Sequence, residues 1–591
     1  MYIITEGEVK MKTEITVKIG GQQGDGIDST GSILATALNK QGFHIATYKH
    51  FASRIKGGHT NDQIRASVNP VHYHGDTTDI LVVLDKESYD FNIGSMASNG
   101  VVLMENKKEE KVEMVDGITV VHASFVKMAE ELGNKIIRNM IMLGSSVYLM
   151  GLHYNIFVPL IEQQFSKKGQ ALVDLNVNAL KTGYEYVQGL GIKPFELQLP
   201  ESEKGQALLI GNEAFAFGAL ASGCRFLGSY PITPASEIME YMKANLPKVG
   251  GAAVQAEDEI AGILMAIGAG FAGVRSLTST SGPGLSLKTE ALGLAGISET
   301  PVVIVNSQRG GPGTGLPTKY EQSDLNTMVY AGHGEIPRIV LTPSTVEECM
   351  LVASQAFNLA EKYQCPVIVA LDLMLSLNKQ TVPDYDLSKF EAIDRGKVLT
   401  EEQLAELDEF NFKRYRLTED GISPRSIPGQ RGGVFTANSN EHSETGHITE
   451  DTGLRNAMMD KRLGKLASFK TKGYEFLGGE EKNVDTLFIG LGSTRGVIEE
   501  VIKDLQEQGE DAGAAHIKIL YPFQAEGITE LVANAKRVVV VENNWTGQLS
   551  GMLQKELQIG SKLQSVKKYD GNPFTKAELL DQVQKLVKEV V

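Results

Sequence analysis

Three acidic residues stand directly before the most apolar stretch of the chain. Glu257, Asp258 and Glu259 precede residues 260–274, a run of small and apolar residues that is typical of a buried helix. One interpretation is that the acids complement the positive end of that helix. The other is chemical, because burial of Glu259, the acid nearest the apolar run, would favour a protonated carboxyl group. Such a group can share a proton with a ring nitrogen, as the cofactor thiamine diphosphate requires.

A cation and a hydroxyl group are further candidates for substrate binding. Arg309 follows the apolar run 301–306, at the place where ligands gather in open α/β sheets. A guanidinium group binds a carboxylate through two parallel hydrogen bonds, although a surface ion pair is the alternative for Arg309. The upstream segment YPITP contains Tyr230 and Thr233, and by itself it is equally typical of a stiff turn between a strand and a helix.

The loop TSTSGPG, residues 278–284, leads into a second segment rich in small residues. Its backbone N–H groups, including those of Ser281 and Gly282, are candidates for contacting a polar ligand at the start of a helix. A tight strand-to-helix turn without a ligand is the alternative interpretation.

The elements that position these residues are read from three β-branched runs. ILVVLD ends at Asp85, PVVIVN at Asn306 and RVVVVENN at Asn544, and each becomes polar at its C-terminal end. Continuous apolar runs of this kind are typical of parallel strands buried on both faces. Helical patterns separate the runs, so the sequence predicts an α/β protein with several doubly wound sheets.

Composition excludes several classes of function. The 591 residues carry a net charge of −16, which argues against nucleic acid as the main partner. Three cysteines without a Cys-x-x-Cys pair predict neither a disulfide framework, an iron–sulfur cluster nor a metal site in this chain. The N-terminus lacks a signal-peptide pattern, and the longest apolar stretch is shorter than the roughly 20 residues of a membrane span. We therefore expect a cytoplasmic protein.

Five motifs occur together and in one order between residues 228 and 325: YPITP, QAEDE, TSTSGPG, QRGGPGTGLPT and EQSDL. Together they resemble the α subunit of 2-oxoacid:ferredoxin oxidoreductases, and the resemblance extends over nearly the whole chain. The N-terminal part resembles the γ domain of that family, fused ahead of the α subunit.

The resemblance implies a role for each candidate residue. Glu259 matches the catalytic carboxylate that contacts the cofactor pyrimidine, with Ser281 and Gly282 in the same cofactor site. Thr233 and Arg309 match catalytic groups that hold the 2-oxoacid, and Arg309 would bind its carboxylate. Substrate contacts are also implied for Tyr230 and Thr318. Lys319-Tyr320 departs from the Arg-Thr that the family pattern led us to expect, which leaves the role of Lys319 open.

The resemblance further implies three doubly wound, mostly parallel-sheet domains. The expected division is a tail at 1–12, a γ domain at 13–195, a pyrimidine-binding domain at 196–380, a linker or extended arm at 381–477, and a transketolase-C-terminal-like domain at 478–591.

The activity implied is oxidative decarboxylation of a 2-oxoacid with coenzyme A, giving acyl-CoA and carbon dioxide and passing electrons to ferredoxin. The fused γ and α parts resemble 2-oxoglutarate enzymes more than pyruvate enzymes. Gly24-Asp25-Gly26 is not followed by the paired asparagines of a diphosphate site, and Asn543-Asn544 has no such motif before it. We therefore expect Mg²⁺ and a [4Fe-4S] cluster on a partner β subunit, in an α₂β₂ assembly.

Other functions remain open at this point. Pyruvate or another 2-oxoacid is an alternative substrate, and the motifs do not decide between them. A non-catalytic nucleotide-binding or regulatory module would predict a full dinucleotide fingerprint, which the sequence lacks. A transketolase-like sugar enzyme would predict histidines beside Glu259 and Arg309, and those stretches contain none.

Overall fold

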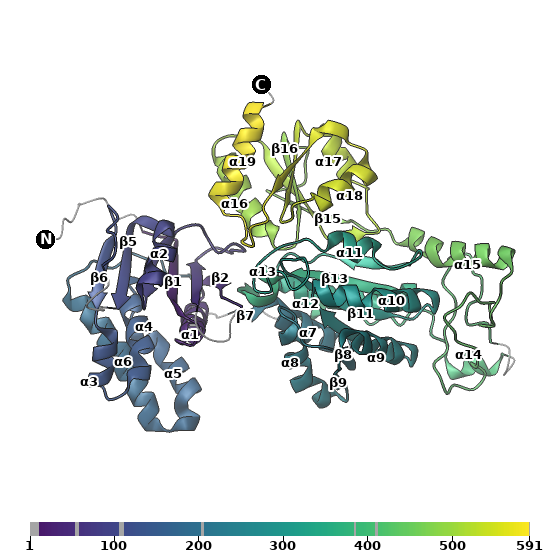
Figure 1. Ribbon diagram of the computed structural model, residues 1–591, viewed down its shortest axis with the longest axis horizontal. Coiled ribbons are helices and arrows are strands. Elements are labelled where there is room, and N and C mark those ends of the chain that lie inside the picture. The colour runs from purple at the N-terminus through teal and green to yellow at the C-terminus, as the bar shows by residue number, and fades with distance from the viewer. Residues whose placement is uncertain are drawn as a thin grey trace. The chain divides into compact units, whose positions relative to one another are not determined.

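The computed structural model describes residues 11–53, 58–105, 111–202, 206–382, 386–407 and 412–589. It divides into two compact units (Figure 1). The first unit comprises residues up to 209 together with 378–385, and the second comprises 210–377 and 386–591. Most of the expected tail lies outside the described residues.

The first unit is built on a mixed sheet of eight strands in the described part of the chain. In spatial order these are β6 (Thr119–Ala123), β5 (Met96–Glu105), β4 (Thr78–Val83), β1 (Glu14–Gln22), β3 (His59–Ser67), β2 (His44–His50), β14 (Lys379–Val382) and β7 (Ala207–Ile210). β6, β5, β4 and β1 run parallel, whereas β3 pairs antiparallel with β1 and β2.

Helices cover both faces of this first sheet. They are α1 (Ile27–Lys40), α2 (Lys86–Asn92), α3 (Phe125–Glu131), α4 (Arg138–Leu149), α5 (Val158–Phe165) and α6 (Gln170–Gly189). Alternate residues of β4 point to opposite layers, so Ile80 belongs to the apolar cluster that contains α4 and α6. Leu81 belongs to a separate cluster with Tyr89 of α2.

Strand β14 reaches the first sheet from far along the chain. Thr381 Oγ1 accepts hydrogen bonds from the backbone N–H of Ile45, at 2.8 Å, and from the side-chain amide of Asn39, at 3.1 Å. The backbone N–H of Lys379 also donates to Thr47 Oγ1, at 2.8 Å. The segment 379–382 therefore adds a strand beside β2.

The central sheet of the second unit is nearly all parallel. Its order is β18 (Ile519–Tyr521), β12 (Ile339–Leu341), β13 (Pro366–Asp372), β11 (Val302–Gln308), β10 (Ser276–Thr280), β8 (Phe226–Ser229) and β9 (Ala252–Gln255). Only the pairing of β12 with β18 is antiparallel among the pairings that the described residues make in this sheet. β10, β11 and β13 are buried along their whole lengths, as their apolar or small side chains predict.

The helices of this part are α7 (Gly211–Ala221), α8 (Ser236–Asn245), α9 (Glu259–Phe271), α10 (Gly282–Ile297), α11 (Leu325–Tyr330), α12 (Val346–Tyr363) and α13 (Leu373–Leu377). Val302 and Ile304 of β11 share one apolar cluster with Ile263 of α9 and Leu285 of α10. Helices α9 and α10 therefore pack together on one face of the sheet (Figure 1).

A third sheet lies in the C-terminal part of the second unit. Its order is β15 (Tyr474–Leu477), β17 (Ala512–Ile517), β16 (Thr486–Leu491), β19 (Arg537–Glu542) and β20 (Leu563–Lys567), and only the edge pair β15–β17 is antiparallel within the described sheet. Its helices are α16 (Thr494–Glu507), α17 (Ile528–Asn534), α18 (Gln548–Leu557) and α19 (Lys576–Glu589). Together the three sheets confirm the predicted α/β class.

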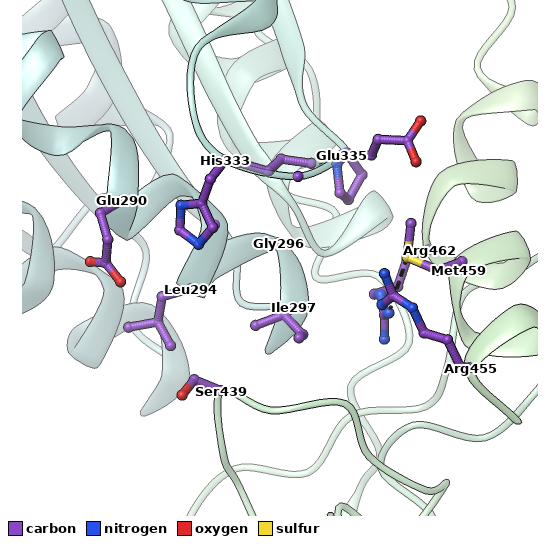
Figure 2. Close-up of a pocket in the computed structure, with 14 residues that line it drawn as sticks. Glu290, Leu294, Gly296, Ile297, His333, Glu335, Ser439, Arg455, Met459 and Arg462 are labelled. Atoms are coloured by element: carbon purple, nitrogen blue, oxygen red, sulfur yellow. Dashed lines mark hydrogen bonds between the residues drawn. The ribbon is translucent and has the colours of Figure 1, made fainter. Parts of the chain in front are cut away.

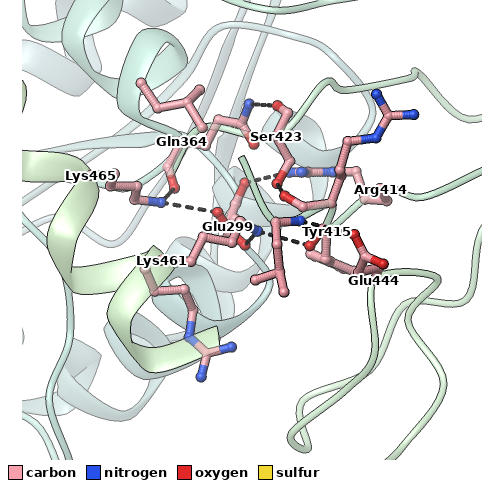
Figure 3. Close-up of polar contacts among 12 residues, drawn as sticks. Glu299, Gln364, Arg414, Tyr415, Ser423, Glu444, Lys461 and Lys465 are labelled. Atoms are coloured by element: carbon pink, nitrogen blue, oxygen red, sulfur yellow. Dashed lines mark hydrogen bonds and ion pairs between the residues drawn. The ribbon is translucent and has the colours of Figure 1, made fainter. Parts of the chain in front are cut away.

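The arm between these sheets contains α14 (Glu401–Ala405) and α15 (Thr452–Gly464) and is anchored by buried charge. Glu299, which follows α10, accepts hydrogen bonds from Lys461 and Lys465, while Arg414 donates to the Glu299 carbonyl oxygen (Figure 3). All four residues are buried. Burial opposes ionisation of Glu299, but the charges of Lys465, Lys461 and Arg414 outweigh it and hold the Glu299 pKa at about 2.

Across the described residues, no helix combines the length and the apolar character that crossing a bilayer requires.

The division of the chain into an N-terminal tail and four further parts stays a prediction.

Candidate active site

The candidate residues gather at one edge of the central sheet. Tyr230 and Thr233 follow β8, Ser281 follows β10 and Arg309 follows β11. These strands run parallel, so their carboxyl ends lie along the same edge, which is where open α/β sheets bind ligands.

Glu259 is the first residue of α9, and its position is set by a helix cap and a close glycine contact. Asp258 caps the helix by accepting a 2.8 Å hydrogen bond from the backbone N–H of Ala261. Glu259 is only 8% exposed, and no described residue donates a hydrogen bond to its carboxylate. A Cβ atom on Gly284 would lie 3.0 Å from Glu259 Oε1 and 2.2 Å from Thr280 Oγ1. The carboxylate therefore lies against the first turn of α10.

A buried lysine stands behind Glu259. Lys288 is inaccessible to solvent, and its ammonium group donates to the carbonyl oxygen of Glu259, at 2.9 Å, and to Thr278 Oγ1, at 3.2 Å. Burial lowers the Lys288 pKa to about 8, and the carboxylates of Glu259 and Asp258 oppose that shift.

Arg309 and Thr233 contact each other directly. The Arg309 guanidinium donates a 2.7 Å hydrogen bond from Nη1 to the Thr233 carbonyl oxygen and a 3.4 Å one from Nη2 to that of Thr314. Arg309 is 7% exposed, and its buried Nε has no partner among the described residues. Burial lowers the Arg309 pKa, and the nearby carboxylate of Asp324 opposes this.

Asp324 places a second carboxyl group at the start of α10. A Cβ atom on Gly282 would lie 2.9 Å from both carboxylate oxygens of Asp324, so a larger residue would collide with them. Asn306 donates to Asp324 Oδ2 at 3.1 Å, and Gln308 Oε1 accepts the Asp324 backbone N–H at 3.1 Å. Burial raises the Asp324 pKa against the effects of the Asn306 hydrogen bond and of Arg309.

Several buried polar atoms in this region have no hydrogen-bond partner in the described part of the chain, and they indicate whether a polar ligand would fit there. Ser281 Oγ, Asn306 Oδ1 and Arg309 Nε are buried and have no hydrogen-bond partner among the described residues. Buried polar atoms without partners are costly, so their concentration at one sheet edge is typical of a binding site. These donors and acceptors, with the unpaired Glu259 carboxylate, fit the aminopyrimidine half of thiamine diphosphate.

The remaining predicted residues lie at the rim. Tyr230 and Thr233 are exposed and Thr318 is half-buried. Lys319 is also half-buried; burial lowers its pKa, opposed by Asp570. The Lys319 carbonyl oxygen accepts a 3.0 Å hydrogen bond from the backbone N–H of Gly310, so the loop returns to the residue next to Arg309.

The EQSDL segment connects this edge to the third sheet. Gln322 donates to Asp372 Oδ2 at 2.9 Å and to the Leu491 carbonyl oxygen at 3.1 Å. Asp372, at the end of β13, also accepts from the backbone N–H of Ser493 at 3.0 Å, next to the start of α16. The two sheets thus meet beside the candidate site.

Two motifs resemble parts of a metal–diphosphate site, but their side chains already accept hydrogen bonds from other groups of the protein. Asp25 accepts a 2.6 Å hydrogen bond from Arg138 and a 3.0 Å one from the backbone N–H of Gln22. The Asn544 side-chain oxygen accepts the backbone N–H groups of Gly547 and Gln548 at 2.8 and 3.0 Å, at the start of α18.

A separate cavity of about 330 Å³ lies between α10 and α15 (Figure 2). Leu294 and Ile297 of α10 line one side, and Arg455, Met459 and Arg462 of α15 line another. Both arginines pair with Glu441, so the cavity has no unpaired arginine for an anion. None of the predicted site residues is among those lining it.

Three family models match successive parts of the chain. The thiamine diphosphate-binding model of pyruvate flavodoxin/ferredoxin oxidoreductases matches residues 217–461, the range that contains the candidate site. The pyruvate ferredoxin/flavodoxin oxidoreductase model matches 16–186, and the model of pyruvate:ferredoxin oxidoreductase core domain II matches 484–578.

Relatives match over almost the full length. The 2-oxoacid:ferredoxin oxidoreductase subunit alpha of Sulfolobus sp is 33% identical over 97% of this chain and 96% of its own. The chain belongs to the 2-oxoacid:ferredoxin oxidoreductase alpha subunits. Another member, the 2-oxoglutarate oxidoreductase subunit KorA of Mycobacterium tuberculosis, is 29% identical over 96% of this chain and 90% of its own.

A solved member of the 2-oxoacid:ferredoxin oxidoreductases has nearly the same fold. The 2-oxoglutarate:ferredoxin oxidoreductase from Magnetococcus marinus, with 2-oxoglutarate, coenzyme A and succinyl-CoA bound, is 35% identical. The match covers 97% of this chain and 99% of that one, with a TM-score of 0.91. The resemblance seen in the sequence motifs is therefore confirmed.

Lys288, Asn306 and Asp324 were missed as site residues. Lys288 has a sequence signal, because it is a lone lysine among the small and apolar residues before Thr289 and Glu290. Asn306 ends the apolar run and Asp324 lies in the EQSDL motif. The sequence does not show that these two side chains lie beside the loop that follows β10.

Proposed function

We propose that this chain is the α subunit of a 2-oxoglutarate:ferredoxin oxidoreductase that converts 2-oxoglutarate and coenzyme A to succinyl-CoA and carbon dioxide, with electrons passing to ferredoxin. The observation on which this rests is the buried Glu259 carboxylate without a donor, at the same sheet edge as Arg309. Two relatives support this acid over pyruvate: the KorA subunit named for 2-oxoglutarate, and the Magnetococcus marinus enzyme solved with 2-oxoglutarate bound.

Glu259 would be catalytic in this chain, together with Thr233 and Arg309. It would hydrogen-bond the aminopyrimidine ring of thiamine diphosphate and hold the proton that the ring exchanges. The cofactor supplies a nucleophilic thiazolium carbon when bound. Ser281 and Gly282, at the start of α10, would also contact the cofactor, and the buried Ser281 hydroxyl has no hydrogen-bond partner among the described residues.

Arg309 and Thr233 would orient the 2-oxoacid. The Arg309 guanidinium, with Nε unpaired, would bind the carboxylate of the acid, and the Thr233 hydroxyl would contact it from the exposed rim. Tyr230 and Thr318 would complete this rim. Water is excluded from the inner part of the site because Arg309, Ser281 and Asn306 are buried.

The chain would work with a β subunit that holds Mg²⁺ and a [4Fe-4S] cluster, in an α₂β₂ cytoplasmic assembly. Apolar side chains are exposed around Glu259 and support an interface there: Ile260, Leu264 and Met265 on α9 and Leu287 on α10. A partner seated on this face would cover the site beside Glu259 and supply the remaining contacts to thiamine diphosphate.

We also propose the domain division expected from the sequence, with a γ domain at 13–195, a pyrimidine-binding domain at 196–380, an arm at 381–477 and a transketolase-C-terminal-like domain at 478–591. The three family models support the domain order, since they match 16–186, 217–461 and 484–578.

The test is purification of the tagged chain from its own cells under anaerobic conditions. The co-purified material is assayed for thiamine diphosphate, iron and acceptor reduction by 2-oxoglutarate or pyruvate, each with coenzyme A. We expect a stoichiometric partner, both cofactors and a preference for 2-oxoglutarate. A chain that purifies alone without either cofactor would overturn the heteromeric function, and a preference for pyruvate would overturn the substrate.

A further inference from the structure

Lys288 is a buried cation with an unusual set of partners. It lies on α10, yet its ammonium group bonds the main-chain carbonyl oxygen of Glu259 on α9 and the hydroxyl of Thr278 on β10. These are its only hydrogen-bond partners in the described part of the chain, and neither is an ionised side chain.

Burying an ammonium group without a direct ion pair is unfavourable, so a site that keeps one needs compensating contacts. The charged groups that act on Lys288 are the carboxylates of Glu259 and Asp258 at the start of α9. The adjacent strands β8 and β10, with sequences FLGS and SLTST, contribute no titratable group, and α10 adds only Glu290. The positive charge of Lys288 therefore faces the acidic end of α9.

We propose that Lys288 is a positioning residue for Glu259: its ammonium group fixes the main chain at the first residue of α9 and provides the positive charge beside which the Glu259 carboxylate meets the cofactor. The inference rests on the proposed function, since it needs Glu259 to contact thiamine diphosphate. It adds a residue that acts through Glu259 and does not touch the cofactor.

Lys288 would position Glu259 in two ways, through a hydrogen bond and through its charge. The 2.9 Å hydrogen bond to the Glu259 carbonyl oxygen ties α9 to α10, and Gly284 of α10 is the surface on which the Glu259 side chain rests. The same lysine thus holds both the main chain of Glu259 and the helix that supports its carboxylate. Its charge adds an electrostatic component that a neutral side chain of equal length would lack.

The charge component predicts a pH dependence. Burial lowers the Lys288 pKa to about 8, with Glu259 and Asp258 opposing the shift. The ammonium form is present below this pH and is lost above it. The electrostatic effect of the Lys288 ammonium group on Glu259 should therefore weaken as the pH rises through about 8.

The experiment compares wild type, K288M, K288R and T278V as complete complexes with the partner subunit. Two quantities are measured between pH 6.5 and 9.5: the affinity for thiamine diphosphate with Mg²⁺ by calorimetry, and the rate of hydrogen–deuterium exchange at the thiazolium C2 by acid-quenched NMR. Neither needs turnover of a 2-oxoacid. K288Q replaces K288M if the methionine variant does not assemble.

We expect wild-type exchange to decrease above pH about 8. K288M should exchange about 10- to 100-fold more slowly at pH 7, a smaller effect than the roughly 10²–10⁴-fold of the acid–base group itself, and should lack the alkaline decrease. K288R keeps its charge at all these pH values, so it should also lack the decrease, but its exchange rate should be higher than that of K288M. T278V removes only the neutral partner and should keep the decrease.

Two results would overturn the proposal. One is a K288M variant that exchanges as fast as the wild type and shows the same decrease at alkaline pH. The other is weaker cofactor binding in K288M with an unchanged exchange rate, which would show a purely structural lysine. E259Q in the same assay separates the two levels of inference: normal exchange in E259Q refutes the proposed function, whereas slow exchange in E259Q with normal exchange in K288M refutes the role of Lys288 alone.

Discussion

The guanidinium group of Arg309 donates a 2.7 Å hydrogen bond to the main-chain carbonyl oxygen of Thr233. The two residues follow different strands, β11 and β8, and lie 76 positions apart. The YPITP turn is held on its other side by Asn212, whose amide donates to the Pro234 carbonyl oxygen at 2.6 Å. Arg309 thus has a structural partner as well as its proposed substrate, and replacing it should affect both.

Replacing Arg309 by alanine should impair use of the 2-oxoacid more than binding of the cofactor. Hydrogen bonds to a charged group contribute about 1.5–3 kcal/mol, so we expect kcat/KM to fall roughly 10- to 100-fold, chiefly through KM. Steady-state kinetics with 2-oxoglutarate measures this. The control is R416A, an exposed arginine of the arm. An unchanged KM in R309A would show that Arg309 serves only the turn.

Replacing Glu259 by glutamine should remove at least about 100-fold of the turnover rate, because a group that holds a proton contributes roughly 10²–10⁴. The side chain keeps its size, so the complex should still assemble. E257Q is the matched control, since Glu257 is the exposed acid two residues earlier. Size-exclusion chromatography and acceptor reduction provide the two readouts. Near-normal turnover in E259Q would refute the thiamine assignment.

A methyl group at position 284 should disturb the site. In G284A the new Cβ would lie 2.2 Å from Thr280 Oγ1 and 3.0 Å from Glu259 Oε1. We expect a loss of about 1–3 kcal/mol in unfolding free energy and weaker cofactor binding, as overpacking predicts. The control G551A adds a methyl group in open space on α18 and should stabilise by about 0.5–1 kcal/mol. Urea denaturation distinguishes them; equal stability of the two variants would contradict the crowding.

Loss of the buried Glu299 charge should release the arm. E299Q leaves Lys461 and Lys465 buried without their carboxylate, so we expect a loss of about 3–5 kcal/mol at pH 7. Because the folded-state pKa of Glu299 is about 2, below its ordinary value of 4.5, its contribution is present above that ordinary value and disappears as the pH falls through 2.

The measurement for E299Q is urea denaturation at pH 7, 5 and 3. The difference between wild type and E299Q should be largest at pH 7 and smaller at pH 3. Glu347 of α12, which pairs with the exposed Lys389, supplies the control E347Q, for which a change below about 1 kcal/mol is expected. A difference that does not vary with pH would contradict the role of the Glu299 charge.

Much of the fold could be predicted from local sequence. The runs ending at Asn306 and Asn544 are buried parallel strands, because such strands have no polar face and their pattern is continuous. Strand β14 could not be predicted: Lys379–Val382 is polar, short and paired with a strand more than 300 residues earlier. Its hydrogen bonds depend on Thr381, whose role only the folded chain reveals.

The site shows the same limit. The positions of Arg309 and Ser281 follow from the strands before them, since the ends of parallel strands meet at one edge. The contact of Asp324 with Gly282 and that of Lys288 with Glu259 depend on which faces of α10 and its neighbours meet. That information lies in packing between segments distant in sequence, not in the spacing of motifs.

The late arrival of β14 affects how the chain is made. A ribosome releases residues 13–202 well before residues 379–382, so the first sheet emerges with the β2 edge unpaired for the synthesis of almost two hundred residues. Open strand edges invite pairing with other chains. An N-terminal fragment expressed alone would keep that edge permanently, whereas the full-length chain covers it once Thr381 and its neighbours have been translated.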